Sequence, residues 1–244
     1  DDGLYAKARS LFISKATMDD LTGRATPRQT DAASRPFDTE PANGERSKRE
    51  RLLRRARFPV VKSLDGYDFS NVRLPDGDAL DGLLDLDFVP CAQDLVFYDK
   101  TGRGKTYLAI GLGMRAVERG LNVRFHQTAE LVLQLGKAKR DGALDSLLRD
   151  LARADLIILD EFGYVPFDID GARLLYQIIA GSYERRSIIF TTNIEFSKWG
   201  TIFADDKLAA AIIDRIVHHG RLIEFTGPSR RVSQALMFGK TDNQ

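Results

Sequence analysis

From residue 95 onward, short apolar runs alternate with longer amphipathic segments. The short runs are rich in β-branched or aromatic residues and apolar on both faces, which predicts buried parallel strands over 95–98, 123–127, 156–160, 187–192 and 222–225. The longer segments repeat apolar positions at a spacing of three to four, which predicts helices over 105–119, 129–140, 144–154, 171–185 and 207–219. This alternation predicts a three-layer αβα fold whose five-stranded parallel sheet is covered by helices.

The chain before this region has a different character. Residues 31–45 contain Pro36, Pro41 and Gly44, which predicts a linker rather than a continuous helix. The basic run that follows predicts a helix until Pro59 and comprises Arg46, Lys48, Arg49, Arg51, Arg54, Arg55 and Arg57. We therefore divide the chain into a mainly helical, basic N-terminal extension over 1–62 and an α/β domain over 63–244.

Composition and charge narrow the class of protein. The 244 residues are 43% hydrophobic, and no apolar run reaches the roughly 18–20 residues of a membrane span. A single cysteine, Cys91, cannot form an internal disulfide, which favours a reducing cytoplasm. The net charge of +1 divides into +5 over 1–62, −7 over 63–94 and +3 over 95–244. The basic run is either a solvated helix or a contact to nucleic acid. Because the chain begins with Asp1 rather than Met, we expect a fragment.

The segment over 100–106, Lys-Thr-Gly-Arg-Gly-Lys-Thr, follows a predicted strand and opens a predicted helix. Its glycines allow backbone N–H groups to converge on an anion at a helix N-terminus. Lys105 would then reach the β- and γ-phosphates of a nucleotide, and the Thr106 hydroxyl would ligate Mg²⁺. The sequence predicts a phosphate-binding loop; the alternative is a glycine-rich turn with an exposed lysine.

Asp99 departs from this pattern, because a full phosphate loop has glycine at that position. Aspartate lacks the freedom of glycine at positive φ and brings a carboxylate toward a polyanion. At roughly 6 Å and an effective dielectric of about 20, the repulsion is about 3 kcal/mol per phosphate charge before screening. A carboxylate that points into the loop would lower nucleotide affinity about a hundredfold, and one that points to solvent would have little effect.

Further polar residues stand where predicted strands end. Asp160 and Glu161 close the apolar run over 156–160, where the first would complete a Mg²⁺ shell and the second would polarise an attacking water. Asn193 follows the next strand and either positions that water or caps the strand. Arg215 on a late helix and Arg231 beyond the last strand are either solvated or stabilise charge on the γ-phosphate.

These motifs, with the segments 57–64, 156–166, 183–193, 196–200 and 208–219, resemble the IstB-like ATP-binding proteins. That family comprises helper ATPases of insertion-sequence transposition and is related to the DnaC-type helicase loaders; both belong to the AAA+ class of P-loop NTPases. The resemblance covers roughly residues 46–240 and implies ATP and Mg²⁺ as cofactors. It implies nucleotide contacts from Thr101, Gly102, Arg103, Gly104, Lys105, Thr106 and Asp160, metal ligation by Thr106 and Asp160, and catalytic roles for Glu161, Asn193, Arg215 and Arg231.

The resemblance also implies a function. Such proteins assemble as homo-oligomers on double-stranded DNA with ATP, hydrolyse it, and direct or stimulate a partner transposase in the cytoplasm, with no membrane involved. Two alternatives remain open: a DnaC-like helicase loader, and a DNA-binding scaffold in which Asp99 impairs nucleotide binding. Besides Asp99, residues 31–45 depart from the family, because relatives continue a helical appendage there.

Overall fold

The computed structural model describes residues 13–24, 44–99, 103–203 and 205–226. The chain divides into two compact units, 1–51 and 52–244. Within the first unit lies α2 (Lys15–Arg24). A further helix covers residues 44–56 and contains the boundary between the units, as the sequence predicts for the basic run. Most of the predicted linker over 31–45 lies outside the described residues.

The second unit contains a six-stranded sheet. Its strands are β1 (Val72–Arg73), β2 (Asp94–Tyr98), β3 (Val123–Gln127), β4 (Leu156–Asp160), β5 (Ser187–Thr192) and β6 (Gly220–Phe225), in the spatial order β1-β6-β2-β5-β4-β3. The five predicted strands pair in parallel. The prediction of five strands is corrected by β1, which pairs antiparallel with β6. With two residues, β1 is too short to give a hydrophobic pattern.

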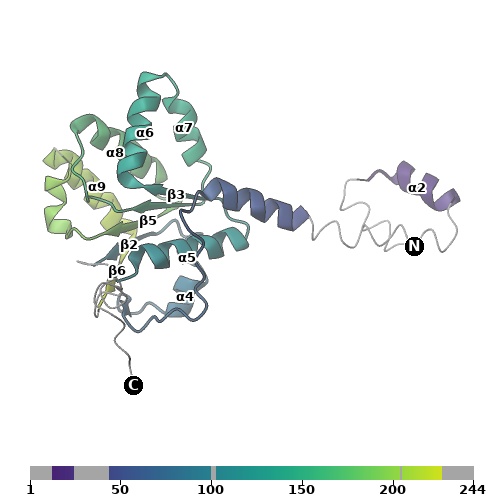
Figure 1. The fold of residues 1–244 in the computed structure, drawn as a ribbon, viewed down its shortest axis with the longest axis horizontal. Helices are drawn as coiled ribbons and strands as arrows, with labels where there is room; N and C mark the ends of the chain where they lie inside the picture. Colours follow the sequence, from purple (N-terminus) through teal and green to yellow (C-terminus); the bar gives the residue numbers. More distant parts are fainter. Residues whose placement is uncertain (1–12, 25–43, 100–102, 204, 227–244) are drawn as a thin grey trace, which may run out of the picture. The chain divides into compact units, whose positions relative to one another are not determined.

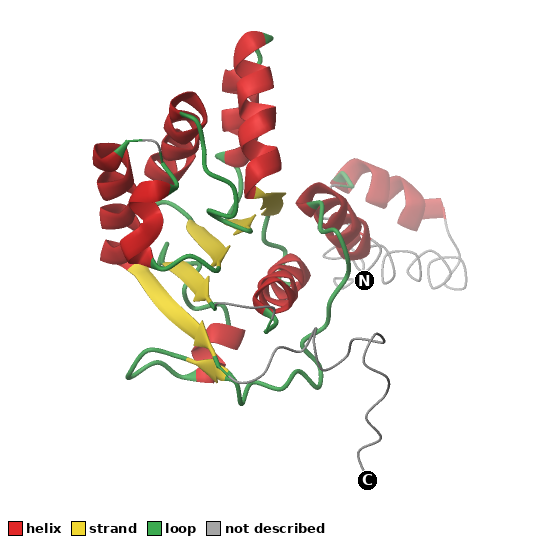
Figure 2. Cartoon of the chain, turned by 60° about the vertical axis from the view of Figure 1, so that its left-hand side comes forward, coloured by secondary structure: helices red, strands yellow, loops and turns green. Residues whose placement is uncertain are grey.

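Helices cover both faces of this sheet (Figures 1 and 2). They are α4 (Leu80–Leu84), α5 (Lys105–Glu118), α6 (Thr128–Arg140), α7 (Leu144–Leu151), α8 (Ile169–Ser182) and α9 (Asp206–His219), with a 3₁₀ turn, η1, at Phe196–Thr201. In β4, Leu156 and Ile158 pack into the core that contains α5, whereas Ile157 and Leu159 pack into the core that contains α6 to α9. Buried side chains on both faces of one strand confirm the predicted three-layer αβα fold.

A glycine follows the C-terminal end of α5. At its C-terminal end Gly120 has φ of 81°. The N–H of Gly120 bonds the carbonyl of Val117 at 2.9 Å, and that of Leu121 bonds the carbonyl of Ala116 at 3.0 Å. This left-handed glycine cap satisfies two carbonyls of the last turn and ends α5.

The strand order decides which chain segments meet at one edge. β2 and β4 both pair with β5, so the carboxyl ends of three parallel strands lie together. Asp99, Asp160 and Asn193 occupy these ends. Open α/β sheets bind their ligands in the crevice at this edge.

Among the described residues, no helix is long and apolar enough to cross a membrane.

Candidate nucleotide-binding site

The described end of the loop is a glycine at the start of α5. Gly104 is the N-cap and has φ of 107°, a conformation that side chains rarely adopt. A Cβ at this position would also lie 3.1 Å from the Tyr67 hydroxyl oxygen. Lys105 follows as the first residue of α5 and is buried, with 6% of its surface exposed. Thr101 and Gly102, both predicted to contact nucleotide, lie outside the described residues.

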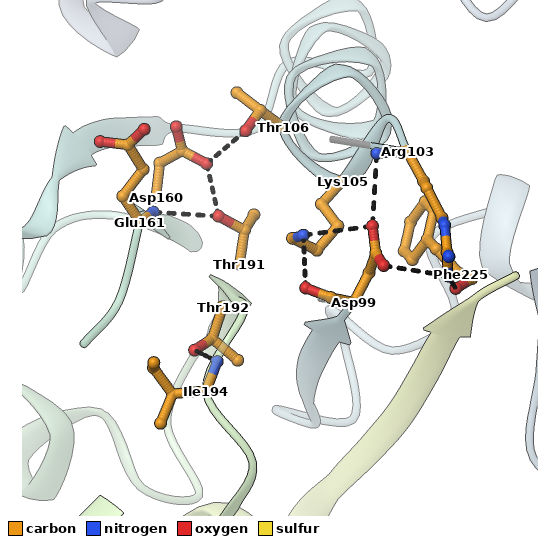
Figure 3. A network of polar contacts seen from close by, with 10 residues as sticks. All are labelled: Asp99, Arg103, Lys105, Thr106, Asp160, Glu161, Thr191, Thr192, Ile194 and Phe225. Atoms are coloured by element: carbon orange, nitrogen blue, oxygen red, sulfur yellow. Dashed lines mark hydrogen bonds and ion pairs between the residues drawn. The ribbon is translucent and has the colours of Figure 1, made fainter. Parts of the chain in front are cut away.

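The first half of the site is a hydroxyl cage around Asp160 (Figure 3). Its Oδ1 accepts hydrogen bonds from the Thr106 hydroxyl at 2.8 Å and the Thr191 hydroxyl at 2.5 Å. Asp160 is 4% exposed, and within the described part of the chain no ion pair engages its carboxylate. Hydroxyl and carboxylate oxygens are ligands that Mg²⁺ accepts in proteins. This donor set therefore fits the metal predicted at Thr106 and Asp160.

Glu161 lies beside this cage at a sharp turn of the chain. It has a φ of 56°, uncommon for a residue other than glycine, and donates its backbone N–H to the Thr191 hydroxyl at 3.0 Å. Asp160 before it and Phe162 after it are buried, whereas Glu161 is exposed. The turn thus presents one carboxylate to solvent next to a buried one, as a water-polarising residue requires.

The remaining predicted catalytic residues differ in position. Asn193 follows β5, and its buried Oδ1 has no hydrogen-bond partner among the described residues, so the side chain retains an unused acceptor. Arg215 lies on α9, where it donates to the Ala211 carbonyl at 2.9 Å and stacks 5.0 Å from the Tyr176 ring centroid. Arg231 lies outside the described residues.

The second half of the site is the surroundings of Asp99 (Figure 3). Its carboxylate is fully buried and points into the loop, with Oδ1 3.1 Å from the Arg103 guanidinium and Oδ2 3.5 Å from the Lys105 ammonium. The backbone N–H of Arg103 donates to Oδ2 at 3.3 Å, and Lys105 donates to the backbone carbonyl of Asp99 at 2.9 Å. Of the two orientations that the sequence leaves open, the structure has the inward one.

The backbone at Asp99 is not strained. The described non-glycine residues with positive φ are Arg57, Leu86, Ala92, Glu161 and Glu184. Asp99 is not one of them, so the expected conflict with glycine's conformational freedom is absent there. The conflict lies in the side chain alone. Groups expected to bind phosphate, an ammonium and a loop N–H, contact the chain's own anion instead.

Thr191 contributes to the site through contacts that the sequence does not reveal. Its hydroxyl accepts from Glu161 and donates to Asp160, so it joins the two acidic residues. The available signal was a hydroxyl near the end of an otherwise apolar strand. Its partner was not readable, because the pairing of β5 with β4 follows from the sheet order and not from the sequence of either strand.

This sheet order, with a helix that begins after Gly104 and an acid at the end of β4, is the P-loop fold of the AAA+ type. Solved structures of the same fold include DnaI, with a TM-score of 0.57 and 20% identity over 68% of this chain and 91% of that chain. The DnaC helicase loader has a TM-score of 0.53 and 20% identity, and the match covers 67% of this chain and 96% of that chain. The replication initiator DnaA bound to AMPPCP and single-stranded DNA has a TM-score of 0.54 and 17% identity, and the match covers 68% of this chain and 50% of that chain.

Sequence comparison narrows the class to one family. Residues 28–237 match the IstB-like ATP binding protein family, and the chain belongs to that family. It is 36% identical over 183 residues to an insertion sequence IS5376 protein of Geobacillus stearothermophilus that is named for ATP binding, covering 75% of this chain and 73% of that protein. An insertion sequence IS21 protein from Pseudomonas aeruginosa, also named for ATP binding, is 38% identical over 185 residues, covering 76% of this chain and 70% of that protein. The resemblance drawn from the motifs is confirmed.

Proposed function

We propose that this protein is an ATP-binding helper of DNA transposition that assembles on double-stranded DNA and directs or stimulates a partner transposase. The observation that carries the proposal is the hydrogen bond between Thr106 and Asp160, 54 residues apart, in a chain of the IstB-like family. A hydroxyl at the start of the loop helix and a buried acid at the end of β4 form a metal-ligand pair only when they meet.

The residues divide the work at this site. Thr106 and Asp160 hold Mg²⁺, while Lys105 and the backbone of Thr101, Gly102, Arg103 and Gly104 bind phosphate. Bound Mg·ATP supplies a phosphoanhydride whose cleavage resets the assembly. Glu161 accepts a proton from the attacking water, and Asn193 orients that water through its amide.

Two arginines are proposed to act on the γ-phosphate, and only Arg215 acts between subunits. Arg215 on α9 completes the site of a neighbouring copy, and Arg231 contacts the γ-phosphate from beyond β6. This arrangement makes the site incomplete in a monomer and links ATP to homo-oligomer formation. An Arg215→Ala variant is expected to bind Mg·ATP normally yet to lose hydrolysis in the assembled state, because its guanidinium acts on the neighbour's nucleotide.

The helix over 44–56 supplies the proposed contact to DNA. Its exposed basic residues are Arg46, Lys48, Arg49, Arg51, Arg54 and Arg55. Each phosphate contact lowers the slope of log affinity against log salt by about 0.9. We propose that the protein acts in the cytoplasm, where its proposed DNA and transposase partners would be.

The experiment that tests the function is assembly on DNA. The protein is incubated with a linear duplex, with or without Mg·ATP, and complexes are sized by light scattering before the transposase of the same element is added. We expect ATP-dependent growth of the complex and capture of the transposase. Arg49→Ala with Arg51→Ala weakens DNA binding and flattens its salt dependence, whereas Lys137→Ala with Lys139→Ala on α6 serves as the matched control. Capture of a replicative helicase in place of the transposase would identify a helicase loader.

A further inference from the structure

We propose that the Asp99 carboxylate is an internal anion that occupies the phosphate cradle, so that nucleotide binds only by displacing it. This inference rests on the proposed nucleotide site and concerns the regulation of that site. In its resting state the Asp99 carboxylate pairs with the Arg103 and Lys105 cations of the loop, and the affinity of the loop for Mg·ATP is set by the competition between two anions for these cations.

The geometry around Asp99 is that of a bound anion. Its carboxylate oxygens have the Arg103 guanidinium at 3.1 Å, the Lys105 ammonium at 3.5 Å and the Arg103 backbone N–H at 3.3 Å. An ammonium, a loop N–H and the N-terminus of α5 are the groups with which a phosphate loop holds phosphate. The Asp99 side chain is 0% exposed, so it is enclosed by these groups rather than lying at their rim.

Arg103 makes the arrangement self-contained. Its guanidinium pairs with Asp99 and also donates to the Phe225 carbonyl at 3.1 Å, which ties the loop to the end of β6. Asp99 and Arg103 together are neutral. Removal of the carboxylate therefore both vacates the cradle and leaves two cations, Arg103 and Lys105, to face a polyphosphate.

Asp99 can be replaced by glycine without a change of backbone conformation, because it has no positive φ. A gain in nucleotide affinity therefore reports the carboxylate rather than released strain. Asp99→Asn retains the size of the side chain and removes its charge, so the pair of variants separates electrostatic competition from bulk. Asp94→Asn is the matched control, because Asp94 is a buried aspartate at the opposite end of the same strand.

The test is a calorimetric titration with Mg·ATP at one fixed salt concentration, using the wild type, Asp99→Gly, Asp99→Asn and Asp94→Asn. We expect Asp99→Gly to bind at least about a hundredfold more tightly than the wild type, which corresponds to about 2.8 kcal/mol. Asp99→Asn is expected to fall between them and Asp94→Asn to match the wild type. Lys105→Ala placed on Asp99→Gly is expected to remove the gain.

A second readout is the melting temperature, measured without nucleotide and then with it. In the absence of ligand, both Asp99 variants are expected to melt at lower temperature than the wild type, because Lys105 and Arg103 lose their carboxylate. With saturating Mg·ATP the order is expected to reverse, since the tighter-binding variants gain more stabilisation. Equal melting temperatures for the wild type and both variants without ligand would overturn the inference.

The outcomes distinguish the inference from the function on which it rests. Equal Mg·ATP affinity in the wild type and Asp99→Gly overturns the internal anion and leaves the ATP-binding helper in place. Absence of binding in the wild type and in both Asp99 variants overturns the nucleotide site itself, and the inference with it. A gain confined to glycine, with asparagine equal to the wild type, overturns charge competition and assigns the block to bulk.

Discussion

Two buried aspartates lie at the carboxyl ends of strands that flank β5, and their surroundings differ in kind. Asp160, after β4, is held by the hydroxyls of Thr106 and Thr191. Asp99, after β2, is held by the cations of Lys105 and Arg103. Both carboxylates are nearly inaccessible to water, so each depends on its protein partners.

The difference teaches what a partner does to a buried charge. Hydroxyls stabilise a carboxylate by donating hydrogen bonds but leave its negative charge in place, so the Asp160 cage still attracts a cation. An ammonium and a guanidinium neutralise the charge, so the Asp99 cluster attracts no further cation, and its groups are already committed to one anion. The same residue type thus offers a ligand for the proposed metal at one strand end and acts as the proposed internal anion at the other.

The largest expected effect concerns the acids of the hydroxyl cage. In the Asp99→Gly background, Glu161→Gln is expected to lower ATP hydrolysis by about a hundred- to ten-thousandfold while Mg·ATP affinity stays unchanged, because a positioned base contributes on that order. Asp160→Asn is expected to lower hydrolysis as strongly and also to remove the Mg²⁺ dependence of binding. Single-turnover hydrolysis and titrations with and without Mg²⁺ separate the two. Loss of affinity in Glu161→Gln would place that carboxylate in the metal shell.

Much of this site was readable from the sequence. The strand over 156–160 is apolar on both faces, and its abrupt end in two acids places Asp160 and Glu161 at the sheet edge without a structure. The glycine at 104 likewise predicts a turn that opens a helix, and the structure has φ of 107° there. At both positions, the residue that the local turn or strand end favours is also the residue that the fold needs there.

What was not readable depends on contacts across the chain. The orientation of Asp99 is decided by Arg103 four residues later and by Lys105 on the first turn of α5, and a side-chain rotamer is not encoded in a spacing. The hydroxyl of Thr191 reaches Asp160 only because β5 lies next to β4. Strand β1 was missed because two residues show no alternation. The predicted domain boundary near residue 62 stays a prediction.

A third buried aspartate extends the comparison to a carboxylate with a backbone partner. Asp94 accepts the Ile188 N–H at 2.7 Å, and burial raises its pKa from 3.8 to about 7 despite this bond. The folded state therefore binds the proton more tightly, and this group's contribution to stability falls as pH rises from about 4 through 7.

Asp94→Asn removes this ionisation. The variant is expected to gain about 4 kcal/mol over the wild type at pH 8, because the pKa of Asp94 rises from 3.8 to about 7 and each pKa unit corresponds to about 1.4 kcal/mol. The gain is expected to vanish near pH 4, where both side chains are neutral. Urea unfolding at a series of pH values measures it. A gain that does not depend on pH would mean that Asp94 has the same pKa in the folded and the unfolded protein.

The smallest expected effect concerns a carboxylate at the surface that has arginine partners. The Asp150 carboxylate accepts hydrogen bonds from Nε and Nη2 of Arg124, each at 3.0 Å. Its Oδ1 also lies 3.0 Å from Nη2 of Arg55. The hydrogen bond from Arg124 lowers the pKa of Asp150 from 3.8 to about 2. The folded pKa lies below the unfolded one, so this stabilisation is complete above about pH 4 and is lost as pH falls through 2.

Asp150→Asn is expected to lower the free energy of unfolding at pH 7 by about 1 kcal/mol. Hydrogen bonds to charged groups contribute about 1.5–3 kcal/mol, and the 43% exposure of the Asp150 side chain screens part of that. The difference from the wild type is expected to shrink between pH 4 and pH 2, in the opposite direction to that of Asp94. Because Arg124 is 4% exposed, a loss well above 1 kcal/mol would show that removing the charge of Asp150 leaves a buried guanidinium without the partner that it needs.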